Sequence, residues 1–135
     1  MHYAEKHKHE LLSIPTQVLN IDSVYFLKNL AILTRDRNST RKLSRSLAAS
    51  ICAIANKRGI RIRKMPLPFG GGGTDASPFA AIGVESTTLI GMPTGLMSNE
   101  HLYHTERDTA ERIETQAVAA VLDLAIRYIK SIDSV

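Results

Sequence analysis

The chain has 135 residues, of which 44% are hydrophobic and 22% charged, and its formal net charge is +4. This length and balance fit a single compact domain over residues 1–135 and exclude a disordered or low-complexity chain. No apolar run approaches the roughly 20 residues that cross a bilayer, and the first residues lack the apolar core of a signal peptide. We therefore expect no membrane partner, and a cytoplasmic protein if these residues are the full chain.

The single cysteine, Cys52, excludes an internal disulfide and the zinc sites that are built from Cys-x-x-Cys pairs. It lies on the apolar side of a predicted helix. We therefore expect it to be a buried small residue and not a nucleophile.

The first third of the chain predicts one helix and two strands. Residues 1–12 have the pattern of the tail of a helix with a charged face, and Pro15 ends it. Residues 16–21 alternate as a strand does, with Asp22 near the end, and residues 30–33 form a second strand.

The middle of the chain predicts a helix followed by a strand. Ser39 or Thr40 can cap a helix that runs to Arg58, and Gly59 fits the left-handed residue after its end. Residues 60–65 alternate between apolar and basic side chains, which indicates a strand with one solvated face.

The last third adds a short helix over residues 77–82, a buried strand over 86–91, a loop over 92–108 and a helix over 110–132. The final helix has an apolar stripe formed by Ile113, Ala117, Val121, Leu124 and Tyr128. Strands that alternate with helices indicate an α/β fold, namely a three-layer αβα domain with a mixed, mostly parallel sheet.

Ten basic residues crowd the middle of the chain with Asp36 as the only acid among them: Arg35, Arg37, Arg41, Lys42, Arg45, Lys57, Arg58, Arg61, Arg63 and Lys64. Such a cluster is usually a solvated helix face and an exposed strand, although it can also attract phosphates or an acidic partner. No aromatic residues stand between the basic ones to stack on bases, so we do not expect a nucleic-acid partner.

Two features suit a ligand site, and each has a simpler structural explanation. Asp22 follows a strand, where α/β sheets place ligands, but an aspartate in this position is more often a turn or capping residue. The run from Gly70 to Gly73 can cradle a phosphate or let the backbone approach another segment closely. Asp75 can cap the helix that follows this run.

The segment Tyr103-His104-Thr105-Glu106-Arg107-Asp108-Thr109 places a histidine in a polar loop before the last helix. One nitrogen of a neutral imidazole can bind a metal while a carboxylate or carbonyl holds the other. Histidines in loops are more often only solvated, and we expect this of His2, His7, His9 and His101.

Three motifs in order resemble the C-terminal part of the zinc-dependent aminopeptidase family, the M-twenty-eight peptidases of clan MH. They are Val18-Leu19-Asn20-Ile21-Asp22, then Gly73-Thr74-Asp75-Ala76-Ser77-Pro78-Phe79 followed by Ile82-Gly83-Val84, and the segment from Tyr103 to Thr109. Aminopeptidases, certain carboxypeptidases and glutaminyl cyclases share this fold. The resemblance covers nearly the whole chain, which would make it an incomplete version of the full domain.

The resemblance implies a role for several residues. Asp22 would be the aspartate ligand of a dinuclear zinc centre, and His104 would be its final histidine ligand. Thr74, Asp75 and Tyr103 would line the pocket for the amino-terminal residue of a peptide substrate. Zinc is the cofactor that the family implies.

The chain departs from the family at its front. The family's earlier ligands are a histidine, a bridging aspartate and the second residue of a Glu-Glu pair, whose first glutamate is the general base. Glu5 and Glu10 are not adjacent and do not match that pair. We therefore expect these residues to be the C-terminal portion of a zinc exopeptidase that is inactive by itself.

The alternative is a module without catalytic function, in which Asp22 and His104 are inherited but idle. A sheet without the family's preceding strands would leave an edge and an apolar face uncovered. We therefore also expect a homo-oligomer that forms through that edge.

Overall fold

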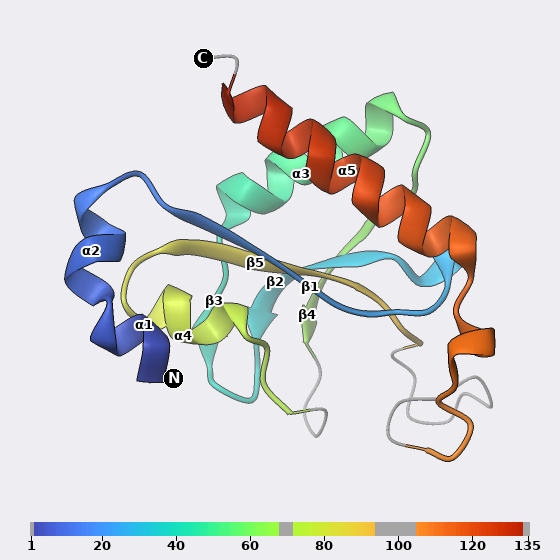
Figure 1. Cartoon of the computed structure of the whole chain (residues 1–135), viewed down its shortest axis with the longest axis horizontal. Coiled ribbons are helices and arrows are strands. Elements are labelled where there is room, and N and C mark those ends of the chain that lie inside the picture. The colour runs from blue at the N-terminus through green and yellow to red at the C-terminus, as the bar shows by residue number, and fades with distance from the viewer. Residues whose placement is uncertain (1, 68–71, 94–104, 134–135) are drawn as a thin grey trace.

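A computed structural model of the chain describes residues 2–67, 72–93 and 105–133, and it has a five-stranded mixed sheet between two layers of helices (Figure 1). The helices are α1 (His2–Lys6), α2 (Lys8–Ser13), α3 (Arg45–Lys57), α4 (Ala76–Ala81) and α5 (Thr115–Asp133), with short 3₁₀ turns at Leu27–Asn29 and Ala110–Arg112. The strands are β1 (Gln17–Val24), β2 (Ala31–Asp36), β3 (Arg41–Lys42), β4 (Arg63–Leu67) and β5 (Glu85–Gly91).

The sheet is mixed, as the sequence predicts. β1 pairs with β5 in parallel, and β2 pairs with β4 in parallel. β2 runs antiparallel to both β5 and β3, and each of these two pairings contains only two residue pairs. The parallel pairings therefore make up most of the sheet.

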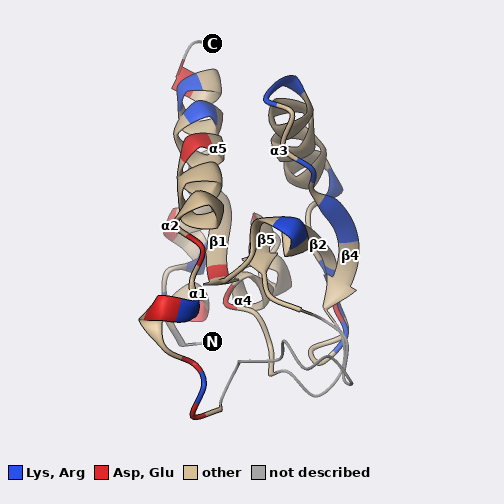
Figure 2. Cartoon of the chain, turned by 90° about the vertical axis from the view of Figure 1, so that its right-hand side faces the viewer, with Lys and Arg blue, Asp and Glu red and all other residues tan. Residues whose placement is uncertain are grey.

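The three-layer arrangement is also confirmed. α3 and α5 cover one face of the sheet, and α1, α2 and α4 lie on the other (Figures 1 and 2). The predicted stripe of α5 contributes Ala117, Val121, Leu124 and Tyr128 to the buried residues, whereas Ile113 precedes the helix and is 39% exposed. Within the described ranges, no helix combines the length and apolar character that a membrane span needs.

The predicted start of α3 is wrong. Thr40 has a left-handed backbone (φ 58°), and the next two residues pair with β2 as strand β3. The cap is Ser44, whose Oγ accepts a hydrogen bond from the Leu47 amide at 3.1 Å. The predicted end is correct, since Gly59 has a φ of 69°.

Other predicted boundaries shift by a few residues. The first helix divides at His7 into α1 and α2, and α5 begins at Thr115 instead of residue 110. β4 begins at Arg63 and includes Pro66, which lacks a backbone N–H. Pro66 is tolerated because β4 pairs only with β2 among the described strands.

Asp36, at the end of β2, is a fully buried acid that joins two segments of the chain. Its Oδ1 accepts hydrogen bonds from the amides of Asn38 (2.9 Å) and Ser39 (3.3 Å). Its Oδ2 accepts from the Thr74 amide (3.2 Å) and from Ser77 Oγ (2.6 Å). Burial raises the pKa of this carboxyl, but the hydrogen bonds, that from Ser77 foremost, outweigh burial and lower the pKa below its ordinary value.

We expect Asp36→Ala to destabilise the fold by about 3 kcal/mol or more, because it leaves several buried donors without an acceptor. Urea unfolding followed by circular dichroism measures the change. Asp123→Ala is the matched control, since Asp123 is partly exposed and its ion pairs with Arg58 and Arg127 lie at the surface. An equal loss of stability in both variants would contradict the role of Asp36.

From the lowered pKa of the Asp36 carboxyl we also predict how the stability of the fold depends on pH. A folded-state pKa below the unfolded value adds stability above pH 3.8, the ordinary pKa of the group, and this stability is lost as the pH falls through the folded-state pKa. Asp36→Asn, which cannot ionise, should lose less stability than the wild type over that acid range. Parallel slopes for the two proteins in urea unfolding at a series of pH values would show that the carboxyl does not contribute.

Candidate functional site

Asp22 lies near the carboxyl end of β1, opposite Ile90 of β5. The strand is irregular immediately after it, where Ser23 adopts a left-handed backbone with φ 50°. Ser23 Oγ donates a hydrogen bond to Asp22 Oδ1 at 3.0 Å. The Asp22 carboxylate is exposed, so the irregularity presents an accessible acid at the end of the sheet.

A cavity of about 20 Å³ lies beside this carboxylate and has room for about one water molecule. It is lined by Asp22, Ser23, Leu33, Leu67, Gly73, Thr74, Thr88, Ile90 and Met92. Asp22 and Thr74, which are separated in the sequence by the whole of β2, α3 and β4, therefore share one wall.

Thr74 is held by a small polar network below Asp22. Its Oγ1 is hydrogen-bonded to Thr88 Oγ1 and accepts from Asn20 Nδ2 at 3.3 Å. Asn20 Nδ2 also approaches Thr88 Oγ1 at 3.4 Å, and the Ala76 amide donates to Thr74 Oγ1 at 3.3 Å. With the bond from its amide to Asp36, Thr74 is fixed from both its backbone and its side chain.

The other predicted site residues have different outcomes. Asp75 immediately precedes α4, but its side chain makes no capping hydrogen bond, so its predicted capping role is wrong. Its side chain is exposed and does not line the cavity beside Asp22. Tyr103 and His104, and with them the predicted histidine ligand, lie outside the described residues.

The segment that follows His104 is attached to the end of β1. The hydroxyl of Tyr25, a buried residue, donates to Asp108 Oδ1 at 2.9 Å. The Glu114 amide donates to the Tyr25 carbonyl at 2.8 Å, and the Leu27 amide donates to Glu114 Oε2 at 2.8 Å. These three bonds fix the chain from Asp108 to Glu114 beside the strand that carries Asp22.

The described part of the chain does not by itself provide a complete metal site. It contains no group of three or more His, Cys, Asp or Glu side chains arranged to hold a metal ion. Asp22 offers one accessible carboxylate, whereas a catalytic zinc uses three protein ligands. The described residues therefore fit at most one position in a zinc site.

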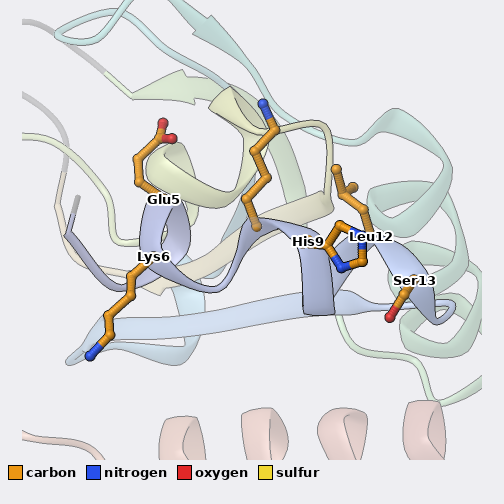
Figure 3. Close-up of a pocket in the computed structure, with 6 residues that line it drawn as sticks. Glu5, Lys6, His9, Leu12 and Ser13 are labelled. Carbon is orange, nitrogen blue, oxygen red and sulfur yellow. The ribbon is translucent and has the colours of Figure 1, made fainter.

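A hollow near the N-terminus is separate from this cavity. It has a volume of about 490 Å³, and its wall is formed by Glu5, Lys6, Lys8, His9, Leu12 and Ser13 of α1 and α2 (Figure 3). The side chains of Glu5 and Lys6 point in opposite directions, so they do not converge on a ligand (Figure 3). His7 stacks on Tyr3 and its Nδ1 lies 3.1 Å from Glu10 Oε2, a local contact on the helix surface.

The ten basic residues of the middle of the chain are all exposed on β2, β3, β4, α3 and their connecting segments, as a solvated surface requires (Figure 2).

Cys52, on α3, is partly buried against the core, and burial raises the pKa of its thiol. Glycine at position 73 lets the backbone approach Asp36 closely, because a Cβ there would lie 3.3 Å from Asp36 Oδ2.

Asp36 is the residue of this region for which the sequence predicts no role. Its signal is visible in retrospect: it is the only acid among ten basic residues, and it follows a strand of buried side chains. Asn20 and Thr88, whose side chains are hydrogen-bonded to Thr74, have no comparable signal in the sequence, because they lie 54 and 14 residues from Thr74.

The profile of peptidase family M28 matches residues 1–129. No curated protein matches the sequence significantly. A solved structure described as the dodecamer PhTET1-12s is similar at 30% identity, with a TM-score of 0.41; the similarity covers 65% of this chain and 28% of that one. Because the family profile spans nearly the entire sequence, the chain belongs to peptidase family M28.

Proposed function

We propose that this chain supplies the Asp22 side of a dinuclear zinc site in an aminopeptidase-type hydrolase, and that these 135 residues alone are inactive. The observation that supports it most is the exposed Asp22 carboxylate at the end of β1, beside the Thr74 cavity, in a chain of family M28. Peptidases of this family are generally zinc-dependent. Zinc, when bound, polarises a scissile carbonyl and lowers the pKa of a bound water.

In this proposal the chain's residues hold and orient the site. Asp22 is one ligand, and its orientation is supported by the hydrogen bond from Ser23. His104 is the second ligand. It stands four residues before Asp108, whose attachment to Tyr25 keeps the chain near the carboxyl end of β1.

The substrate in this proposal is the amino-terminal part of a peptide. Thr74, Asp75 and Tyr103 line its pocket, and the Thr74 backbone is positioned by Asp36. A rigid wall suits this role, because a substrate must be held accurately for its carbonyl to be attacked.

Two ligands are too few for activity. A stable catalytic zinc site uses three protein ligands, and a general base contributes about 10²–10⁴-fold to the rate. Neither a third ligand nor an adjacent pair of glutamates is assigned within this sequence. A complete active centre would therefore require additional residues.

We expect the chain to bind zinc weakly, and Asp22→Asn and His104→Ala each to weaken that binding by at least about tenfold. Isothermal titration calorimetry measures the affinity. Asp133→Asn, which removes the same charge at the end of α5, and His9→Ala on α2 are the matched controls and should bind as the wild type does.

Equal affinity in the wild type and in either site variant would remove that residue as a ligand. A loss of binding in His9→Ala that matches the loss in His104→Ala would instead assign the zinc to the histidines of the N-terminal helices.

We also expect no hydrolysis of aminoacyl chromogenic substrates by the 135-residue chain with added zinc, because the base and further ligands are absent. A spectrophotometric assay with and without a chelator measures this. Turnover that disappears on chelation and in Asp22→Asn would contradict the inactivity of the isolated chain.

A non-catalytic module is the second candidate. It is favoured by the apolar side chains that α5 exposes and by the absence, within the described residues, of a group of three metal ligands. In that case zinc binding by the chain would be independent of both Asp22 and His104.

A further inference from the structure

A groove lies between α3 and α5, which stand side by side on one face of the sheet (Figure 2). Its volume is about 330 Å³, at the lower end of the range for small-molecule sites. The groove, called the α3–α5 groove below, is lined by Ile54, Lys57, Arg58, Arg127, Lys130 and Ser131. Leu47 and Ile51 of α3 share one buried cluster with Val121 and Tyr128 of α5. The shape of the groove is therefore set by two helices that pack against each other.

The α3–α5 groove is rich in positive charge. Four of its six lining residues are basic, and all four are exposed: Lys57, Arg58, Arg127 and Lys130. Asp123 of α5 is the acid that the two arginines share, and its single charge can balance only one of these four. An excess of positive charge along both walls attracts anions.

Asp123 also holds the two arginines in place. Its Oδ2 accepts hydrogen bonds from Arg58 Nε at 3.1 Å and from Arg127 Nε at 2.9 Å, and its Oδ1 accepts from Arg127 Nε at 2.8 Å. The hydrogen bond from Arg127 lowers the pKa of Asp123 below its ordinary value, so the carboxylate is charged at neutral pH. Within the described chain these bonds use Nε, which leaves the terminal Nη amino groups of both arginines for a ligand.

The arrangement of the two arginines suits a phosphate group. A guanidinium presents its N–H donors in a planar fork that matches phosphate oxygens. Because both arginines bond to the same oxygen of Asp123, the two forks lie close enough together to reach one phosphate. A phosphate monoester carries about −1.5 to −2 charges at pH 7 and has three terminal oxygens. A carboxylate has one charge and two oxygens, and it would satisfy the two forks less well.

The same groove also offers apolar surface. Ile54 is partly buried and packs against the core cluster below the two helices. The methylene stems of the lysines and arginines add apolar area around it, since such side chains place only their ends in water. A ligand that fills the groove therefore has an apolar group beside its phosphate.

We propose that the α3–α5 groove binds a soluble phosphate monoester that has an apolar group next to the phosphate. Arg58 and Arg127 bind the phosphate oxygens through their Nη groups. Lys57 and Lys130 add positive charge around the phosphate, and Ile54 contacts the apolar group.

The test uses phenyl phosphate as the probe in an NMR titration of the ¹⁵N-labelled chain. We expect saturating shifts of the Arg58 and Arg127 Nε signals. Arg58→Gln and Arg127→Gln should each weaken the binding at least about tenfold, because each removes hydrogen bonds to a charged group. Arg45→Gln is the matched control, since it removes the same charge at the start of α3, outside the groove, and it should bind as the wild type does.

Two further comparisons separate a phosphate site from a general attraction of charge. Arg127→Lys retains the positive charge but not the planar fork, so it should also weaken the binding. Phenylacetate, which carries a carboxylate in place of the phosphate, should bind more weakly than phenyl phosphate. Circular dichroism of each variant verifies that it is folded, and the Arg58 variant carries the test if the Arg127 variants unfold.

The absence of a saturating shift would overturn the proposal, and so would equal losses in Arg45→Gln and Arg127→Gln or equal affinity for phenylacetate. Sedimentation with vesicles that contain phosphatidic acid examines a lipid source of the same chemical group. A chain that sediments with these vesicles but does not bind phenyl phosphate would overturn a soluble ligand and assign the groove to a membrane surface. The groove contains neither Asp22 nor His104, so this titration and the zinc calorimetry can fail separately.

Discussion

One buried carboxylate controls the geometry of the candidate site. Asp36 is the only charged residue in the buried part of the described chain, and it accepts hydrogen bonds from the turn after β2 and from the segment that begins α4. A buried carboxylate is tolerable only when its hydrogen bonds are made, so these two segments must come together. Their meeting fixes Thr74, and Thr74 in turn contacts Asn20 and Thr88 below the Asp22 cavity. The position of the cavity wall thus depends on a side chain that does not line it.

The sequence predicts the fold well where local chemistry decides the structure. The helical period of α5 identifies its buried residues, and glycine at position 59 marks the end of α3, because both signals act within a few residues. The start of α3 is different. Ser39 and Thr40 are suitable caps, but the next two residues pair with the end of β2, and this contact outweighs their local preference for a helix. Ser44 is then the first capping residue available. The extent of β4 likewise follows from its pairing with β2 and from its position at the edge, where a proline is tolerated.

The candidate site shows the same division. Asp22 could be selected from the sequence because it follows an alternating strand, and the structure brings it beside Thr74 as one wall of a cavity. The bonds that support this wall could not be selected, since they join residues from four separate elements and no short motif encodes them. The attachment of Asp108 to Tyr25 spans 83 residues and was equally hidden, although Asp108 belongs to a recognised motif. Sequence motifs therefore identified candidate ligands, whereas long-range contacts determined how they are held.

β1 serves two purposes without conflict because its side chains alternate. Asn20 and Asp22 point to the α4 face, where the cavity lies, while Leu19 and Ile21 point to the face covered by α3 and α5. The cavity beside Asp22 and the core packing of β1 therefore occupy opposite faces of one strand, and a substitution on the core face leaves the side chains that line the cavity in place.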